Sequence, residues 1–315
     1  MDATGAVPQS RWADLDGPVH YVDYGGPTDA PMVVCVHGLG GSLVNWAALA
    51  PLLTPTCRVA ALDLAGFGHT RGGHRSTAVH ANQRLLNRFL HDVTGSPVIL
   101  VGNSMGGLIS ILQAHEHPGT VAGLVLVDPA LSLTGGSRPD PRVLATFAAY
   151  AVPAIGRAVL ARRRSTMSAE ESAHDLLALC TVDPSRIPTH VVDQHVRMAE
   201  QRRSYSDIDS ELLTAARSLL FVIADRGKYA AMQRSIAAPV LLLHGDKDRL
   251  VPVASARAAA RANPAWQYEE AADVGHVPQL EVPEWTAERI LGWLAAHPGA
   301  VATAALARPP LLARP

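Results

Sequence analysis

Short apolar runs recur along the chain, and stretches with helical spacing separate them. The runs that we predict to be strands cover residues 19–24, 32–36, 59–63, 98–101, 124–127 and 240–244. Strands that are apolar on both faces are typical of a parallel sheet covered by helices on both sides. The stretches 46–53, 78–90 and 105–115 fit helical crossovers between neighbouring parallel strands. The pattern therefore predicts an α/β fold.

This alternation of strands and helices stops after residue 128 and resumes at residue 239. The intervening residues are rich in Arg and Ala and lack the alternation of a strand, so we expect a helical insertion. The organisation predicts a core formed by 1–128 and 239–297 and a helical cap formed by 129–238. The last stretch, 298–315, mixes Ala, Pro and Arg without periodicity, and we expect a flexible tail there.

Inside the insertion, the apolar stretch 148–160 is followed by Arg162, Arg163 and Arg164. Apolar and cationic residues in this order are compatible with an interfacial helix that contacts anionic lipid. They are equally compatible with a cap helix whose last turn carries cations that complement the helix dipole. Both interpretations stay open at this point.

Composition excludes several classes of protein. Hydrophobic residues make up 48% of the chain, charged residues 17%, and the net charge is -1, which argues against disorder and against a nucleic-acid partner. No apolar run approaches the roughly 20 residues of a membrane-spanning helix, and the start of the chain shows no secretory signal, so we expect a cytoplasmic protein. Cys35, Cys57 and Cys180 lack the spacing of metal ligands or of a disulfide framework, and we expect buried thiols and no metal.

The strongest local signal is the segment 102–107, Gly-Asn-Ser-Met-Gly-Gly, which follows an apolar strand and opens a helix. A sharp turn from strand to helix strains its central residue and leaves little room around it, so glycine is needed on either side. Such a turn exposes the hydroxyl group of Ser104 beside the positive end of the helix dipole. We therefore predict that Ser104 is a nucleophile.

A serine nucleophile needs a base that an acid holds in the right tautomer. In the chain order Ser, acid, His, the base is predicted to be His276, because Gly275 allows a loop to present it. His244 and His297 fit structural roles better. The acid is predicted to be Asp248, in the loop after the strand 240–244, and Asp128 at the end of the preceding strand is the competing candidate.

Acyl transfer also needs two fixed donors for the oxyanion of the tetrahedral intermediate. The backbone N–H of Met105, directly after the nucleophile, and that of Leu39, in the loop 37–41, are the predicted donors. His37 in the same loop is predicted to be structural. The loop lacks the Lys-Ser/Thr of a P-loop and the spacing of a dinucleotide fingerprint, so we expect no nucleotide cofactor.

Together these motifs resemble the α/β-hydrolase superfamily. The resemblance is carried by the loop 37–38, the turn 63–68, the elbow at Ser104, the Asp248 loop and the dipeptide 275–276. It implies a mostly parallel eight-stranded sheet with a helical cap inserted after the sixth strand. It further implies a serine hydrolase, without a cofactor, that cleaves an ester or thioester of a small molecule through an acyl-enzyme.

Two other functions remain open within this resemblance. The elbow 103–107 is similar to that of the meta-cleavage-product C–C hydrolases, but Val277 stands where those enzymes usually have Trp. A ligand-binding member without activity is the other alternative. In each case apolar cap residues are expected to form the walls of the pocket, and Phe147 and Leu176 are the predicted examples.

Overall fold

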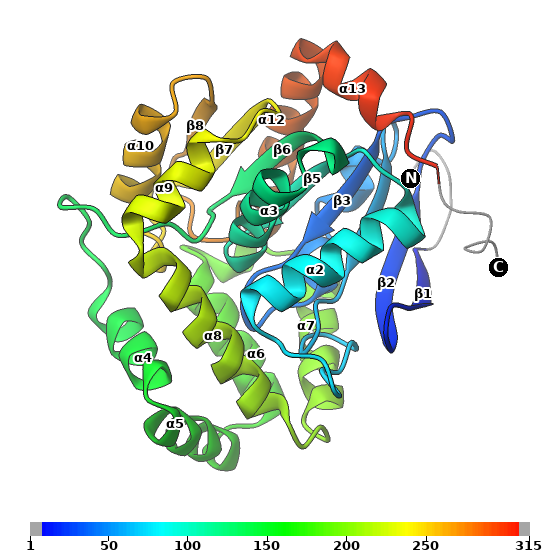
Figure 1. The fold of residues 1–315 in the computed structure, drawn as a ribbon. Helices are drawn as coiled ribbons and strands as arrows, with labels where there is room; N and C mark the ends of the chain where they lie inside the picture. Colours follow the sequence, from blue (N-terminus) through cyan, green and yellow to red (C-terminus); the bar gives the residue numbers. More distant parts are fainter. Residues whose placement is uncertain (1–7, 309–315) are drawn as a thin grey trace.

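The computed structural model describes residues 8–308, and its centre is one sheet of eight strands in the order β1-β2-β4-β3-β5-β6-β7-β8 (Figure 1). The strands are β1 (Gln9–Asp14), β2 (Pro18–Gly25), β3 (Met32–Val36), β4 (Arg58–Leu62), β5 (Val98–Asn103), β6 (Val121–Val127), β7 (Val240–Gly245) and β8 (Gln267–Ala271). β2 runs antiparallel to β1 and to β4, and the pairs from β4 to β8 are parallel. The predicted α/β class and the mostly parallel eight-stranded sheet are confirmed.

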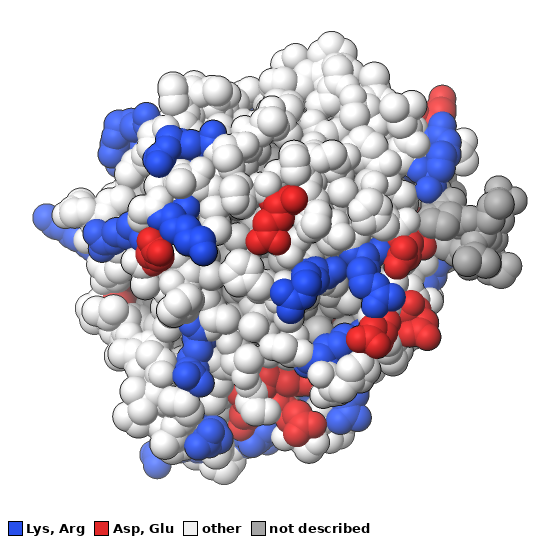
Figure 2. Space-filling view, in the orientation of Figure 1, with Lys and Arg blue, Asp and Glu red and all other residues white. Residues whose placement is uncertain are grey.

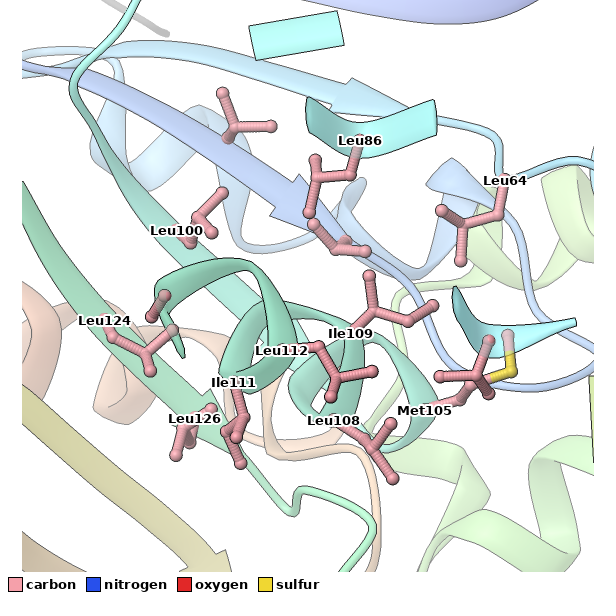
Figure 3. Close-up of a cluster of buried hydrophobic side chains, with 14 of the residues drawn as sticks. Leu64, Leu86, Leu100, Met105, Leu108, Ile109, Ile111, Leu112, Leu124 and Leu126 are labelled. Atoms are coloured by element: carbon pink, nitrogen blue, oxygen red, sulfur yellow. The ribbon is translucent and has the colours of Figure 1, made fainter. Parts of the chain in front are cut away.

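The core lies on both faces of this sheet, because alternate residues of each central strand point to opposite sides. Val34 and Leu100 belong to one hydrophobic cluster, and their neighbours Val33 and Val101 belong to the other. The first cluster packs against α2 (Val79–Phe89) and α3 (Met105–Glu116), and the second against α1 (Ala50–Leu53), α12 (Pro283–Ala296) and α13 (Pro298–Ala304). Figure 3 shows Ile111 of α3 next to Leu126 of β6.

Two strands and one helix differ from the prediction. β1 and β8 were not predicted, because both are edge strands with polar sequences, QSRWAD and QYEEA, that lack an apolar run. The expected helix 46–53 is instead the short 3₁₀ helix η1 (Leu43–Trp46) followed by the short α1. Ser42 and Asn45 form a capping box at the start of η1, and this local capping fixes the chain there.

The expected flexible tail is wrong for the part that the structure describes. Residues 298–304 form α13, which packs against β5 and β6, and Ala304 and Ala307 are fully buried. Small side chains let this short helix approach the sheet closely, which a search for apolar periodicity does not detect. Residues 309–315 lie outside the described part of the chain.

Between β6 and β7 the insertion contains no strand and forms helices from residue 141 onward. They are α4 (Pro141–Ala151), α5 (Pro153–Thr166), α6 (Ala169–Cys180), α7 (Thr189–Arg202), α8 (Ile208–Ala224) and α9 (Arg226–Arg234), before α10 (Val253–Ala262) follows β7. α9 packs on α3, and Tyr229 Oη donates a hydrogen bond to Ala130 O at 2.8 Å. The last helix of the insertion therefore belongs to the helical layer of the core. α8 packs against this layer through Ala215, Leu219 and Val222, and α4 and α5 lie farther out (Figure 1).

Candidate active site

The turn between β5 and α3 holds Ser104 in a strained conformation, with φ 54° and ψ -119°. A positive φ is uncommon for a residue other than glycine and often marks a functional site. A Cβ atom at Gly102, two residues before the serine, would lie 2.7 Å from Gly106 O, so only glycine fits at this position. The geometry is that of the predicted elbow, with the side chain held at the start of α3.

His276 and Asp248 lie in the loops after β8 and β7, and His276 Nδ1 is 2.7 Å from Asp248 Oδ2. The other oxygen of Asp248 accepts hydrogen bonds from the N–H groups of Leu250 at 2.7 Å and Val251 at 3.0 Å. With Nδ1 donating to the carboxylate, Nε2 of His276 is left with a free lone pair, and it has no hydrogen-bond partner within residues 8–308. The ring is thus in the tautomer that a general base needs.

Asn103 connects the elbow with the histidine loop. Its Nδ2 donates to His276 O and to Val127 O, each at 3.0 Å. The residue directly before Ser104 is therefore bound to the backbone of His276, and the structure brings the predicted serine, histidine and aspartate to one edge of the sheet.

Asp128 is fully buried beside this group, with its own hydrogen bond. Its Oδ1 accepts from the N–H of Gly245 at 2.9 Å, and His244 Nε2 lies 3.5 Å from it and 3.4 Å from Asp248 Oδ2. His276 contacts Asp248 rather than Asp128, so the geometry favours Asp248 as the acid. His244 donates to Val251 O at 2.8 Å, the structural role that the sequence predicts.

The pKa values of the two buried carboxyl groups are shifted in opposite directions. Burial raises the pKa of Asp128 well above its usual range, and the negative charge of Asp248 raises it further. Burial also acts to raise the pKa of Asp248, but the charge and hydrogen bond of His276, with a smaller contribution from His244, outweigh it and lower that pKa. The two shifts favour the negative charge on Asp248 and the proton on Asp128.

Ligand atoms of Asp128, His244 and Asp248 lie within 4.8 Å of one another, close enough for a shared metal ion. A metal would have to compete with the hydrogen bonds that these atoms already make to His276, Gly245 and the backbone at 250 and 251. The donor set is therefore better suited to holding the histidine than to holding an ion.

The loop after β3 lies directly against the elbow, because a Cβ atom at Gly38 would be 2.9 Å from Ser104 Cβ. Leu39 follows Gly38 in this loop, and Met105 follows Ser104 in the chain. Neither N–H makes a hydrogen bond within residues 8–308, so both are free to act as the predicted oxyanion donors. His37 holds the loop, since its Nδ1 donates to Gly38 O at 2.8 Å and its Nε2 accepts from the N–H of Leu64 at 3.1 Å.

Two buried carboxylates that support the site were missed at the sequence level. Asp63 accepts hydrogen bonds from His20 Nδ1 at 2.7 Å and from the N–H of Leu43 at 2.8 Å, next to the oxyanion loop. Glu281 accepts from the N–H of Gly275 at 2.8 Å and from the N–H groups of residues 182 and 183 at 3.0 Å each. Single acidic residues carry no sequence signal for such contacts.

The role of Phe147 and Leu176 as pocket residues stays a prediction. Phe147 packs its ring edge-on against Tyr150, and Leu176 is 36% exposed, because α6 buries Ala173 and Leu177 instead. Leu212 of α8 lies next to the loop after β3, since its Cδ1 would be 3.8 Å from a Cβ atom at Gly40. The position of a residue around the helix axis decides whether it is buried. Spacing in the sequence does not reveal which face of a helix contacts the core.

Comparison with protein families shows to which family this chain belongs. Residues 31–283 match the family of the alpha/beta hydrolase fold. The chain belongs to the α/β-hydrolase family. This enzyme is lipase-like, since several of the proteins to which it is similar are lipases.

Three relatives of this α/β-hydrolase illustrate the range of the family. The dihydrolipoyllysine-residue acetyltransferase component of the acetoin cleaving system of Pseudomonas putida is 26% identical over 298 residues, 94% of this chain and 71% of that protein. Human monoacylglycerol lipase ABHD6 is 23% identical over 290 residues, 88% of this chain and 81% of the lipase. The structure of 2-hydroxy-6-oxo-6-phenylhexa-2,4-dienoate hydrolase from Rhodococcus sp. strain RHA1 has a TM-score of 0.68 and 20% identity, covers 92% of this chain and 100% of its own, and shows the shared fold.

Proposed function

We propose that this α/β-hydrolase cleaves a carboxylic ester or thioester with a sizeable apolar group through an acyl-enzyme intermediate. The observation that carries the proposal is the 2.7 Å hydrogen bond between His276 Nδ1 and Asp248, which leaves Nε2 of His276 without a partner within residues 8–308. Asn103, the residue before the strained Ser104, contacts the backbone oxygen of the same histidine. Similarity to lipases supports the ester class.

In the proposed mechanism, Ser104 Oγ attacks the carbonyl carbon while His276 Nε2 takes its proton. The N–H groups of Leu39 and Met105 stabilise the oxyanion. His276 then gives its proton to the leaving alcohol or thiol, and the acyl group stays on Ser104. A water molecule then attacks the acyl carbon while His276 Nε2 takes its proton. His276 passes this proton to Ser104 Oγ as the acyl bond breaks and the acid is released. Asp248 stays ionised throughout and stabilises the charged imidazole.

The test is turnover of p-nitrophenyl esters by the full chain and by Ser104→Ala. We expect the variant to fold normally and to lose a factor on the order of 10⁴ to 10⁶ in kcat, because the triad acts as a unit. An organophosphonate should label Ser104, as mass spectrometry can show. Near-normal turnover in Ser104→Ala would remove the serine from its role.

A parallel screen separates the remaining alternatives. It compares oxygen esters, acyl-thioesters and a vinylogous diketone of the meta-cleavage type. Turnover of the diketone alone would identify a C–C hydrolase, and a chain that binds these compounds without turning any over would be a ligand-binding member of the family.

A further inference from the structure

The helices α4 and α5 have an unusual charge pattern. Residues 141–169 contain no Asp or Glu, whereas Arg142, Arg157, Arg162, Arg163 and Arg164 all lie there. Such a one-sided segment carries a positive charge that nothing within it offsets.

The same helices expose large apolar side chains. Leu144 is 55% exposed, Val152 46%, Ile155 51% and Val159 40%. Ile155 and Val159 are one helical turn apart and so share one face of α5, whose buried residues are Gly156 and Leu160. A helix that only covered a core would present polar side chains on its outer face, so this exposed apolar face calls for a partner.

A groove lies between the end of α4, α8 and the start of α2. Its volume is about 630 Å³, and Ala151 at the end of α4 and Leu220 and Phe221 of α8 contribute to its lining. Phe221 is 81% exposed at its edge. We call the surface formed by Leu144, Val152, Ile155, Val159 and Phe221 the α4–α5 face. In Figure 2 the surface over α4 and α5, at the lower left, is mainly white with blue side chains.

The arginines of this segment fall into two groups. Arg163 is 2.5 Å from Asp175 and Arg164 is 2.6 Å from Asp209, so these two are neutralised by α6 and α8 and anchor α5. Arg142, Arg157 and Arg162 are exposed and form no ion pair within residues 8–308, and the same is true of Arg217 on the rim of the groove. Of the three consecutive arginines, only Arg162 is free to meet an outside charge.

We propose that the α4–α5 face binds the surface of an anionic phospholipid bilayer. The apolar side chains enter the boundary between headgroups and acyl chains, and the unpaired arginines contact the headgroup phosphates. A second copy of the chain fits this face poorly, since two such faces would bring arginines together with no acid between them. Nucleic acid would meet the cations but would leave the exposed leucine, isoleucine and phenylalanine without a partner.

The contact that we propose is with the membrane surface. No single helix in the described part of the chain is long and apolar enough to cross a bilayer. α4 and α5 reach that length and hydropathy only together, and the two are bent by 119° at their junction. Two short helices at such an angle present their apolar sides to one plane more readily than they span it.

The test is co-sedimentation of the full-length Ser104→Ala protein with vesicles of phosphatidylcholine, with and without phosphatidylglycerol. The inactive variant keeps the lipids intact, so the result does not depend on the proposed ester hydrolysis. We expect binding to the anionic vesicles, weaker binding at high salt, and a loss of about tenfold in affinity on Ile155→Glu or on the double change Arg157→Gln and Arg162→Gln.

Matched control variants distinguish binding through the α4–α5 face from non-specific binding to vesicles. Trp12, 56% exposed on the edge strand β1, is changed to Glu as the apolar control, and Arg261 of α10 is changed to Gln as the charge control. Both should bind vesicles as the parent does. Ile155→Glu in the active enzyme should keep its turnover of a water-soluble ester, which shows that the fold is intact.

Three results would overturn the proposal. They are equal binding by the Ile155→Glu protein, binding that does not depend on anionic lipid, and a dimer in solution that Ile155→Glu dissociates. The last result would assign the α4–α5 face to a second copy of this chain.

Discussion

At the scale of single residues, the site depends on how Asp128 and Asp248 divide one proton and one charge. Both side chains are fully buried, and only Asp248 meets a cation, the imidazolium that forms on His276. The sequence predicts that both acids lie at the same edge of the sheet, but it contains no distances that decide which of them contacts the histidine. The 2.7 Å contact of His276 provides the ranking.

We predict that Asp248→Asn lowers kcat/KM on the order of 10⁴-fold, because the amide holds the imidazole in the wrong tautomer. Asp128→Asn should cost far less, since its protonated carboxyl and an amide are both neutral. Steady-state turnover of one soluble ester checks both variants. If the two losses were reversed in size, Asp128 would be the acid.

The raised pKa of Asp128 also predicts a pH effect on stability. A carboxyl group whose pKa is higher in the folded than in the unfolded protein favours folding at acidic pH, and this contribution is lost as pH rises toward the folded pKa. The Asp128→Asn variant has no titrating group at this position and so does not lose stability in this way. Its free energy of unfolding relative to that of the parent should therefore increase from acidic to neutral pH. Urea unfolding across this range is the measurement, and a pH-independent difference would contradict the assignment.

The lowered pKa of Asp248 acts in the opposite direction. Its ionised form stabilises the folded protein above the unfolded pKa, roughly 3.9, and this contribution is lost as pH falls through the lower folded value. Asp248→Asn therefore serves as the control of opposite sign in the same unfolding experiment.

At the scale of elements, strands and helices with a strong apolar pattern were predictable, and polar or small-residue elements were not. β3 coincides with its predicted range, since all five of its residues are buried. β8 escaped prediction because two neighbouring glutamates lie in it, and α13 because alanines form its buried side. Contact with the rest of the fold, rather than local pattern, determines these elements.

One buried side chain connects several elements, and we predict that it matters for stability. Glu281 of α11 (Pro278–Glu281) is 2% exposed and accepts three backbone N–H groups from the His276 loop and from the chain after α6. Glu281→Ala should cost about 3 kcal/mol, because these donors lose their partner in a buried place. Urea unfolding measures the loss. The exposed Glu284→Ala is the matched control and should stay within about 0.5 kcal/mol of the parent.

At the scale of the whole molecule, the fold and the order of the three site residues followed from the sequence because each motif lies at the carboxyl end of a strand. The division between core and insertion was harder to predict. The chain leaves the core after β6, but its return is gradual, since α8 contacts α2 and α9 joins the core layer before β7 begins. Helical spacing alone does not say which layer a helix belongs to.

This placement of α8 predicts where substrate choice is made. Leu212→Ala should enlarge the space next to Gly40 and shift the preference among esters toward longer or bulkier acyl groups, with a change of roughly tenfold in relative kcat/KM. An ester series of increasing chain length measures the shift. Leu176→Ala, on the exposed side of α6, is the control and should leave the preference unchanged. An unchanged profile for Leu212→Ala would place the acyl group elsewhere.

The end of α6 is fastened to the loop that carries His276. Cys180 O accepts a hydrogen bond from the His276 N–H at 2.6 Å, and a Cβ atom at Gly275 would lie 2.9 Å from Thr181 Cα. Glu281 accepts hydrogen bonds from backbone N–H groups of the same two segments. A motion that lifted α6 would therefore also displace the backbone of His276, whereas a motion of a helix that lacks this contact would leave that backbone in place.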